Sequence, residues 1–268
     1  MHKCGSNLDA YERRIGRWSR HAAVQFLGWL DLPAGGRWLD VGAGTGAITA
    51  AISAACAPAL LVGSDASAAD LRYGRAQRQD GGAALVVADA VAFPIYSATF
   101  DAVVSALLLN HLHDPALAVA EMLRVSRPGG TVAAYVWDFG GAMQPLRLFW
   151  DAAIAVDPAA AARDQAAKFP ICSLERLGAL FSASGLHDVD TRALDVAADF
   201  QSFADLWEPL VTGDGSVVDY ARSLPRERLL ALRDRLRQSA PPAPDGSIHL
   251  IARALAVRGR VGARTSVL

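Results

Sequence analysis

Three glycines alternate with other residues directly after a short apolar segment in the stretch GRWLDVGAGTG, residues 36–46. They are Gly42, Gly44 and Gly46. A glycine turn between the end of a buried strand and the start of a helix lets a ligand approach bare backbone N–H groups. Open parallel sheets bind ligands at the edge formed by the carboxyl ends of their strands. The spacing therefore predicts a ligand-binding turn.

Three aspartates accompany this turn along successive apolar segments. Asp40 lies two residues before the first glycine, Asp65 ends the segment ALLVGSD, and Asp89 ends the segment AALVVAD. A carboxylate at the position of Asp65 accepts hydrogen bonds from ribose hydroxyls. Asp89 stands where a carboxylate would accept from an adenine amino group, with the backbone N–H of Ala90 on a ring nitrogen. We expect these groups to share one edge of the sheet.

Two ligand classes use such a turn. The dinucleotide pattern G-x-G-x-x-G/A is satisfied by Gly42, Gly44 and Ala47, and the alternative G-x-G-x-G of adenosylmethionine sites is satisfied with Gly46. Asp40 favours the second class, because a carboxylate repels a pyrophosphate but attracts a sulfonium or ammonium group. Its own role stays open between two interpretations. It contacts the amino-acid end of the ligand, directly or through water, or it holds the turn through backbone N–H groups.

Five ordered motifs resemble those of class I S-adenosylmethionine-dependent methyltransferases. They are WLDVGAGTG, VGSDAS, VVADAVAFP, FDAVVSALLLNHLHDP and EMLRVSRPGGTVAAYVWD, within residues 36–138. The resemblance is closest to the ubiquinone/menaquinone-biosynthesis-like (methyltransferase type 11) branch, whose N-terminal lead resembles YERRIGRWSR. It implies methyl transfer from S-adenosylmethionine to a small molecule, with S-adenosylhomocysteine as product. The cofactor-binding residues it implies are Trp18, Asp40, Gly42, Ala43, Gly44, Asp65, Ala66, Asp89, Ala90 and Ser105.

The resemblance also indicates where the acceptor would lie. Residues 9–20 precede the first strand, where such enzymes carry a lid, and Gly16 is the expected joint. The residues we expect in the substrate pocket are Tyr11, Leu107, His111, Trp137 and Met143. His111 and Asp138 are the candidate catalytic groups, although His111 also fits a structural role in a strand-to-helix turn. We expect alignment and desolvation, rather than one general base, to drive an in-line displacement.

Apolar strands alternate with helices over the first half of the chain. The predicted strands are 37–41, 59–65, 83–89, 99–106 and 128–138, and the predicted helices are 19–32 with Ser19 as N-cap, 46–56, 67–79 and 114–127. Strands without polar alternation indicate a parallel sheet covered on both faces. Beyond them we expect helix over 145–183 with breaks at Pro158 and Pro170, strand over 186–194, helix over 199–238 with Pro225 in a first turn, and a last strand over 247–259.

The predicted fold is an α/β, Rossmann-like, doubly wound sheet of seven strands, mostly parallel with an antiparallel last strand, plus a helical cap. We divide the chain into an N-terminal helical lid (1–35), a cofactor-binding core (36–138), a helical cap with the sixth strand (139–246) and the final strand of the core (247–259). Two alternatives remain for the function: an NAD(P)-dependent oxidoreductase, and a non-catalytic methyltransferase-fold protein that uses the cap as a partner surface.

The composition and charge of the chain limit the classes of partner that we expect. The net charge of −1 gives no field for collecting nucleic acid. The sequence shows no apolar segment for a signal peptide or a membrane span, no Ser/His/Asp set and no cluster of metal ligands. Three cysteines, Cys4, Cys56 and Cys172, lie far apart, which argues against zinc and suits a reducing cytosol. We expect a cytoplasmic enzyme with a small-molecule substrate and no bound metal.

Overall fold

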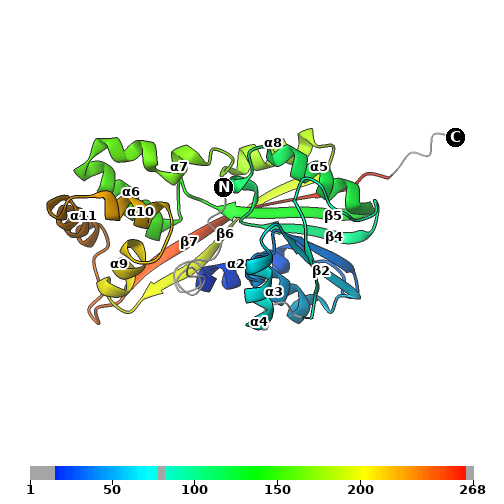
Figure 1. Cartoon of the computed structure of the whole chain (residues 1–268), viewed down its shortest axis with the longest axis horizontal. Coiled ribbons are helices and arrows are strands. Elements are labelled where there is room, and N and C mark those ends of the chain that lie inside the picture. The colour runs from blue at the N-terminus through cyan, green and yellow to red at the C-terminus, as the bar shows by residue number, and fades with distance from the viewer. Residues whose placement is uncertain (1–15, 78–81, 264–268) are drawn as a thin grey trace.

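The computed structural model describes residues 16–77 and 82–263. Within these residues seven strands form one sheet in the order β3-β2-β1-β4-β5-β7-β6 (Figure 1). The strands are β1 Arg37–Val41, β2 Leu60–Asp65, β3 Ala84–Val87, β4 Phe100–Ala106, β5 Ser126–Trp137, β6 His187–Phe200 and β7 Ile248–Arg260. Strands β1 to β5 pair in parallel, and β7 runs antiparallel between β5 and β6. The predicted fold class, including the antiparallel last strand, is confirmed.

Helices cover both faces of this sheet. Helices α2 (Arg17–Leu30) and α3 (Ala47–Cys56) pack on one face, and α5 (Pro115–Val125) and α8 (Leu174–Ala183) pack on the other. Helix α4 (Ala68–Ala76) lies beside β2 and β3. Because strands β1, β4 and β5 are buried on both sides, they carry the nearly unbroken apolar residues that the sequence shows.

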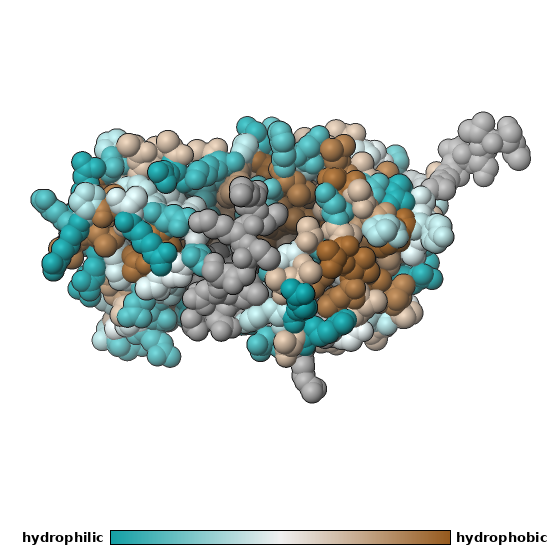
Figure 2. All heavy atoms as spheres, in the orientation of Figure 1, coloured by the Kyte–Doolittle hydropathy of each residue, from teal (hydrophilic) through white to brown (hydrophobic). Residues whose placement is uncertain are grey.

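A helical cap, defined here as residues 144–163 and 203–239, gathers at the far end of the long β6–β7 pair (Figure 1). It contains α6 (Gln144–Val156), η3 (Pro158–Arg163), α9 (Phe203–Val211), α10 (Ser216–Ser223) and α11 (Arg226–Ser239). The short helices η2 (Leu109–His111) and α7 (Gln165–Lys168) complete the described elements. In the same orientation, Figure 2 shows hydrophilic atoms over much of the cap and apolar atoms gathered over the region of β2.

Among the boundaries that differ from the sequence-based expectation, three concern a named residue or a long segment. Helix α2 begins at Arg17, so Ser19 is a buried residue inside the helix and not its N-cap. Strand β6 continues to Phe200, well past the predicted end at 194, because it pairs with β7 over its whole second half. Pro225 occupies the N-cap position of α11 rather than its first turn. The breaks near Pro158 and Pro170 do occur, as the start of η3 and shortly after the end of α7.

Candidate active site

The glycine turn adopts a backbone that favours glycine at each of its three positions. The φ angles of Gly42, Gly44 and Gly46 are 76°, 54° and 95°. The N–H groups of Gly42 and Ala43 donate to the Ser64 carbonyl at 2.8 and 2.9 Å, which ties the turn to the end of β2. A Cβ on Gly42 would lie 2.8 Å from Leu108, whereas a Cβ on Gly44 would meet nothing nearer than a backbone oxygen at 4.0 Å. The space beside Gly44 is therefore open to a ligand.

Asp65 lies at the junction between this turn and the start of α4. Its Oδ2 accepts from the Gly44 N–H at 2.9 Å, and its Oδ1 accepts from the Ser67 N–H at 2.8 Å. A carboxylate has about four acceptor positions, so each oxygen can still receive another donor. The structure thus orients this side chain beside the open face of Gly44.

Asp89 lies after the end of β3 and is exposed, while the neighbouring Ala90 is half-buried. Its Oδ1 accepts from the Val91 N–H at 3.1 Å, and the Ala88 N–H donates to the Asp65 carbonyl at 3.1 Å. Since β3, β2 and β1 are neighbours in the sheet, the structure brings the two acids and the glycine turn to one edge.

Asp40 is completely buried beneath the turn. Its Oδ2 accepts from the hydroxyl of Thr49 on α3, and its Oδ1 has no hydrogen-bond partner among the described residues. Burial raises the pKa of this carboxyl to about 7; the Thr49 hydrogen bond opposes that rise, and the charge of Asp65 adds to it. The Thr49 hydroxyl is a partner that neither sequence-based interpretation included.

Ser105 and two of the three predicted alanines differ in exposure. Ser105 is buried and donates its hydroxyl to the Val41 carbonyl at 3.0 Å, which joins β4 to the last residue of β1. Ala43 is buried in the turn, and Ala66 is exposed next to Asp65. The hydroxyl of Ser105 therefore supports the strand end from which the turn begins.

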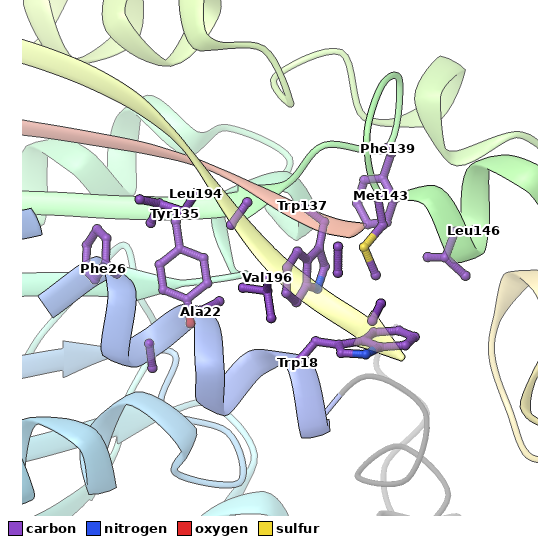
Figure 3. Close-up of a cluster of buried hydrophobic side chains, with 14 of the residues drawn as sticks. Trp18, Ala22, Phe26, Tyr135, Trp137, Phe139, Met143, Leu146, Leu194 and Val196 are labelled. Carbon is purple, nitrogen blue, oxygen red and sulfur yellow. The ribbon is translucent and has the colours of Figure 1, made fainter. Parts of the chain in front are cut away.

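The predicted aromatic and methionine residues lie in an apolar cluster between the sheet and the cap (Figure 3). Trp18, Trp137 and Met143 are 4%, 3% and 0% exposed. The Trp18 ring meets Phe200 edge-on, with 5.9 Å between the ring centres, and the Trp137 indole N–H has no hydrogen-bond partner among the described residues. In the described part of the chain these residues act as packing elements at the junction.

Leu107, at the end of β4, is half-buried and takes an uncommon positive φ of 59°. Its N–H donates to the Tyr135 carbonyl at 2.8 Å, which fixes the turn toward His111. Tyr11, and residues 9–15 of the predicted lid, lie outside the described residues. Arg17 lies over the rings of Trp18 and Phe200, at 5.0 and 4.6 Å from their centres.

The two candidate catalytic groups have different surroundings. His111 is exposed, and its ring lies edge-on to Phe169 at 5.4 Å. Asp138 is half-buried, and its Oδ2 accepts from the Ala142 N–H at 2.8 Å in the turn that leads into α6. The Asp138 carboxylate thus holds the turn before α6, and the His111 ring packs against Phe169.

A Ser–His–Asp contact that the sequence analysis missed occurs at the end of the β6–β7 pair. His249 contacts Asp199 at 2.7 Å and Ser247 at 2.9 Å. The Ser247 hydroxyl donates to Asp245 at 2.6 Å, and the side chains of His249 and Asp199 are 64% and 62% exposed. A hydroxyl committed to a carboxylate in open solvent lacks the activated, water-excluded setting of a nucleophile. We assign this set to the surface of the hairpin.

The described residues offer neither a metal site nor a membrane span of the helical kind. No group of three or more His, Cys, Asp or Glu side chains there is arranged to hold a metal ion. None of the helices over the same residues has the length and apolar character needed to cross a membrane.

Comparison with known proteins identifies the domain that carries the glycine turn. Residues 39–134 match the family model described as a methyltransferase domain. The chain is 38% identical over 101 residues to a demethylmenaquinone methyltransferase of Roseiflexus sp. (strain RS-1), which covers 38% of this chain and 42% of that protein. It is 32% identical over 155 residues to a ubiquinone/menaquinone biosynthesis C-methyltransferase of Burkholderia thailandensis, covering 56% and 63%. The chain therefore spans less than two thirds of either relative.

Solved structures share the fold at low sequence identity. The YcgJ protein of Bacillus subtilis superposes with a TM-score of 0.56 at 17% identity, over 91% of this chain and 99% of that one. Phosphoethanolamine N-methyltransferase 2 of Haemonchus contortus, solved with S-adenosyl-L-methionine, gives a TM-score of 0.59 at 15% identity, over 95% and 56%. These likenesses confirm the architecture.

Proposed function

Because residues 39–134 form a methyltransferase domain of the class I S-adenosylmethionine-dependent family, with S-adenosylmethionine as its cofactor, we propose that this protein methylates a small-molecule acceptor. One observation carries the proposal most directly. Asp65 and Asp89 follow two neighbouring strands, and Asp65 accepts from the N–H of Gly44, whose side-chain position is open among the described residues. A ligand rich in hydrogen-bond donors, such as an adenosyl group, fits that combination.

The residues of the edge fit the cofactor in defined roles. Asp65, oriented by the Gly44 and Ser67 N–H groups, accepts from the ribose hydroxyls with its remaining acceptor positions. Asp89 and the backbone N–H of Ala90 receive the adenine. Asp40, whose Oδ1 has no partner among the described residues, lies beneath the amino-acid end and supplies a negative potential there when it is ionised, above its raised pKa of about 7. When bound, S-adenosylmethionine supplies a methyl group that its sulfonium has already activated.

The remaining work of the site is alignment and exclusion of water. The residues of the site would hold the acceptor in line with the methyl group that a bound S-adenosylmethionine would supply, and the proton of the acceptor would pass to solvent after the transfer. Asp138 is engaged in the turn before α6 and His111 is exposed, which supports a reaction without one dominant base. Alignment is worth roughly 7–11 kcal/mol and a positioned base about 10²–10⁴ in rate.

We infer an acceptor with an apolar body, such as a reduced quinone ring. The names of the two relatives support this class. The free thiols of Cys56 and Cys172 are consistent with a cytoplasmic location. Neither relative is named as an oxidoreductase, so the comparisons give the dinucleotide alternative no support.

Titration calorimetry with S-adenosylhomocysteine and with NAD separates the two ligand classes. The parent should bind S-adenosylhomocysteine and not NAD. Asp65→Ala should bind it about tenfold or more weakly, since a charge-assisted hydrogen bond is worth roughly 1.5–3 kcal/mol. Asp234→Ala, at an exposed position of α11, is the matched control and should bind like the parent. Equal affinity in Asp65→Ala and the parent would remove Asp65 from the site.

Methyl transfer itself is tested with methyl-labelled S-adenosylmethionine and a demethylmenaquinol that carries one isoprene unit. We expect label in the quinol, and His111→Gln and Asp138→Asn should each lower kcat by less than about a hundredfold. A thousandfold loss in His111→Gln with unchanged cofactor affinity would make His111 a general base. Binding of the cofactor without transfer to this or other phenolic acceptors would favour the non-catalytic alternative.

A further inference from the structure

A second pocket lies at the opposite edge of the sheet, where the parallel strands begin. Its floor is one row of residues across four strands, because Trp38 pairs with Ala102, Ala102 with Thr131, and Thr131 with Arg260. Residues paired in this way place their side chains on the same face. The pocket has a volume of about 350 Å³, within the range of small-molecule sites.

The end of α2 explains why this part of the face is uncovered. The helix ends at Leu30, and the chain then returns to β1 through residues 32–36, which form one wall of the pocket. The small side chain of Ala102 leaves room between the larger Trp38 and Arg260 on the floor. Gly35 and Gly129 stand on the rim with positive φ angles of 80° and 75°, and a Cβ on either would meet no atom within 4 Å.

The polar groups of the pocket are mainly donors. Thr131 is 3% exposed, and its hydroxyl has no hydrogen-bond partner among the described residues. Arg260 is exposed and, within the described residues, makes one long hydrogen bond, 3.3 Å to the Gly129 carbonyl, which leaves most of its guanidinium N–H groups available there. A buried hydroxyl without a hydrogen-bond partner destabilises the folded protein, so a ligand that accepts a hydrogen bond from it would offset that loss.

The charged side chains that line the pocket favour a negatively charged ligand. Arg127 and Arg260 are positive, and Asp101 is the one negative side chain among the lining residues. Asp101 is already engaged, because it forms an ion pair with Arg127 and accepts from the Arg37 N–H at 2.7 Å. The pocket therefore carries one excess positive charge, located at Arg260 beside the Thr131 hydroxyl.

We propose that this pocket binds a small organic carboxylate with an apolar, ring-sized body. Arg260 presents paired N–H groups to the carboxylate, and Thr131 donates its hydroxyl to the same group. Leu32, Pro33 and Ala34 supply the apolar surface for the body of the ligand, above the buried ring of Trp38. The site is separate from the glycine turn, since the two lie at opposite ends of β1, and it goes beyond the proposed methyl transfer.

Benzoate and 1-naphthoate are suitable probes, with inorganic phosphate as the comparison anion. We expect saturable binding of at least one aromatic acid below about 10 mM, with a shift of the Trp38 indole N–H resonance in nitrogen-resolved NMR spectra. Saturation with S-adenosylhomocysteine should leave this affinity unchanged. Competition between the two would place the acid in the acceptor site and overturn the proposal. Phosphate binding that equals benzoate binding would also overturn it, because the apolar body would then contribute nothing.

Two variants separate ligand binding from a structural role. Arg260→Gln should weaken benzoate about tenfold or more, and Thr131→Val, which keeps the side-chain shape, should weaken it about threefold to tenfold. Without ligand, Thr131→Val should be as stable as the parent or more stable, because it removes a hydroxyl that has no partner. Arg235→Gln on α11 is the control for loss of one surface charge. No binding by the parent, or binding in both pocket variants that equals that of the parent, would contradict the site.

Discussion

Asp40 combines complete burial with one hydrogen-bond donor, the Thr49 hydroxyl. Its pKa rises from an ordinary value of 3.8 to about 7, mainly because burial disfavours the charged form. Between these two values the folded protein holds a proton that the unfolded chain releases. The free energy of unfolding should therefore fall as the pH rises through this window, by an amount on the order of 4 kcal/mol.

The Asp40→Asn variant tests this linkage, since its amide does not titrate. Urea unfolding at pH 5 and pH 8 should show a smaller loss of stability with rising pH in the variant than in the parent. Asp234→Asn, at an exposed position, should keep the pH dependence of the parent. If Asp40→Asn and the parent follow the same pH profile, Asp40 is ionised throughout and the burial argument fails.

The sequence predicted those residues of the candidate site whose side chains come at the end of an apolar segment. Asp65 and Asp89 are of this kind, and the structure brings them to the edge that holds the glycine turn. Thr49 was missed, although a hydroxyl at the third position of the apolar helix AITAAISAAC, close in sequence to a buried acid, was an available signal. The contact between Asp199 and His249 was missed because only the register of β6 on β7 brings them together.

At the scale of the element, the glycine turn assigns different tasks to two of its glycines. Gly42 is enclosed by Leu108, whereas Gly44 faces open space. Gly42→Ala combines a positive φ with a contact of 2.8 Å, so it should cost about 2–4 kcal/mol of stability. Gly44→Ala carries only the backbone strain, about 1–2 kcal/mol, but its methyl group occupies the space proposed for the cofactor.

Chemical denaturation and calorimetry with S-adenosylhomocysteine measure the two effects separately. We expect Gly42→Ala to be the less stable variant. We expect Gly44→Ala to be the more stable of the two and yet to show the larger loss of affinity for S-adenosylhomocysteine. Gly185→Ala is a suitable reference, because that glycine also has a positive φ and an open surrounding but lies far from the turn in sequence. The reverse order of affinities would mean that the ligand does not approach Gly44.

The sequence predicted the ends of a strand correctly where consecutive residues of that strand are all buried. Strand β1 matches its prediction because four of its five residues are buried in a row. Strand β6 was underestimated because its second half alternates between buried and exposed residues, and its continuation depends on pairing with β7. The start of α2 was misplaced because Ser19, a common N-cap residue type, is instead packed inside the helix.

At the scale of the whole molecule, sheet and cap share one apolar cluster. The cluster in Figure 3 joins Trp18 on α2, Trp137 on β5 and Val196 on β6 to Met143 before the first helix of the cap. Strands β6 and β7 also extend from the sheet into the cap region (Figure 1). Shared strands and a shared cluster couple the two parts energetically, so we expect them to unfold together.

Met143→Ala tests that coupling and the alternative that Met143 lines the acceptor pocket. Met143 is fully buried, so its truncation should cost about 2–5 kcal/mol, with one cooperative transition followed by tryptophan fluorescence and circular dichroism. Met122→Ala is the matched control, because Met122, on α5, is equally buried on the opposite face of the sheet. In both variants the sheet and the cap should unfold together in one transition at a lower midpoint than in the parent, because the two parts share strands and a buried cluster.

A cap that melts first in Met143→Ala, while the sheet keeps the stability of the parent, would make the cap an independent unit. A variant with parental stability and a raised KM for the quinol would instead return Met143 to the acceptor pocket.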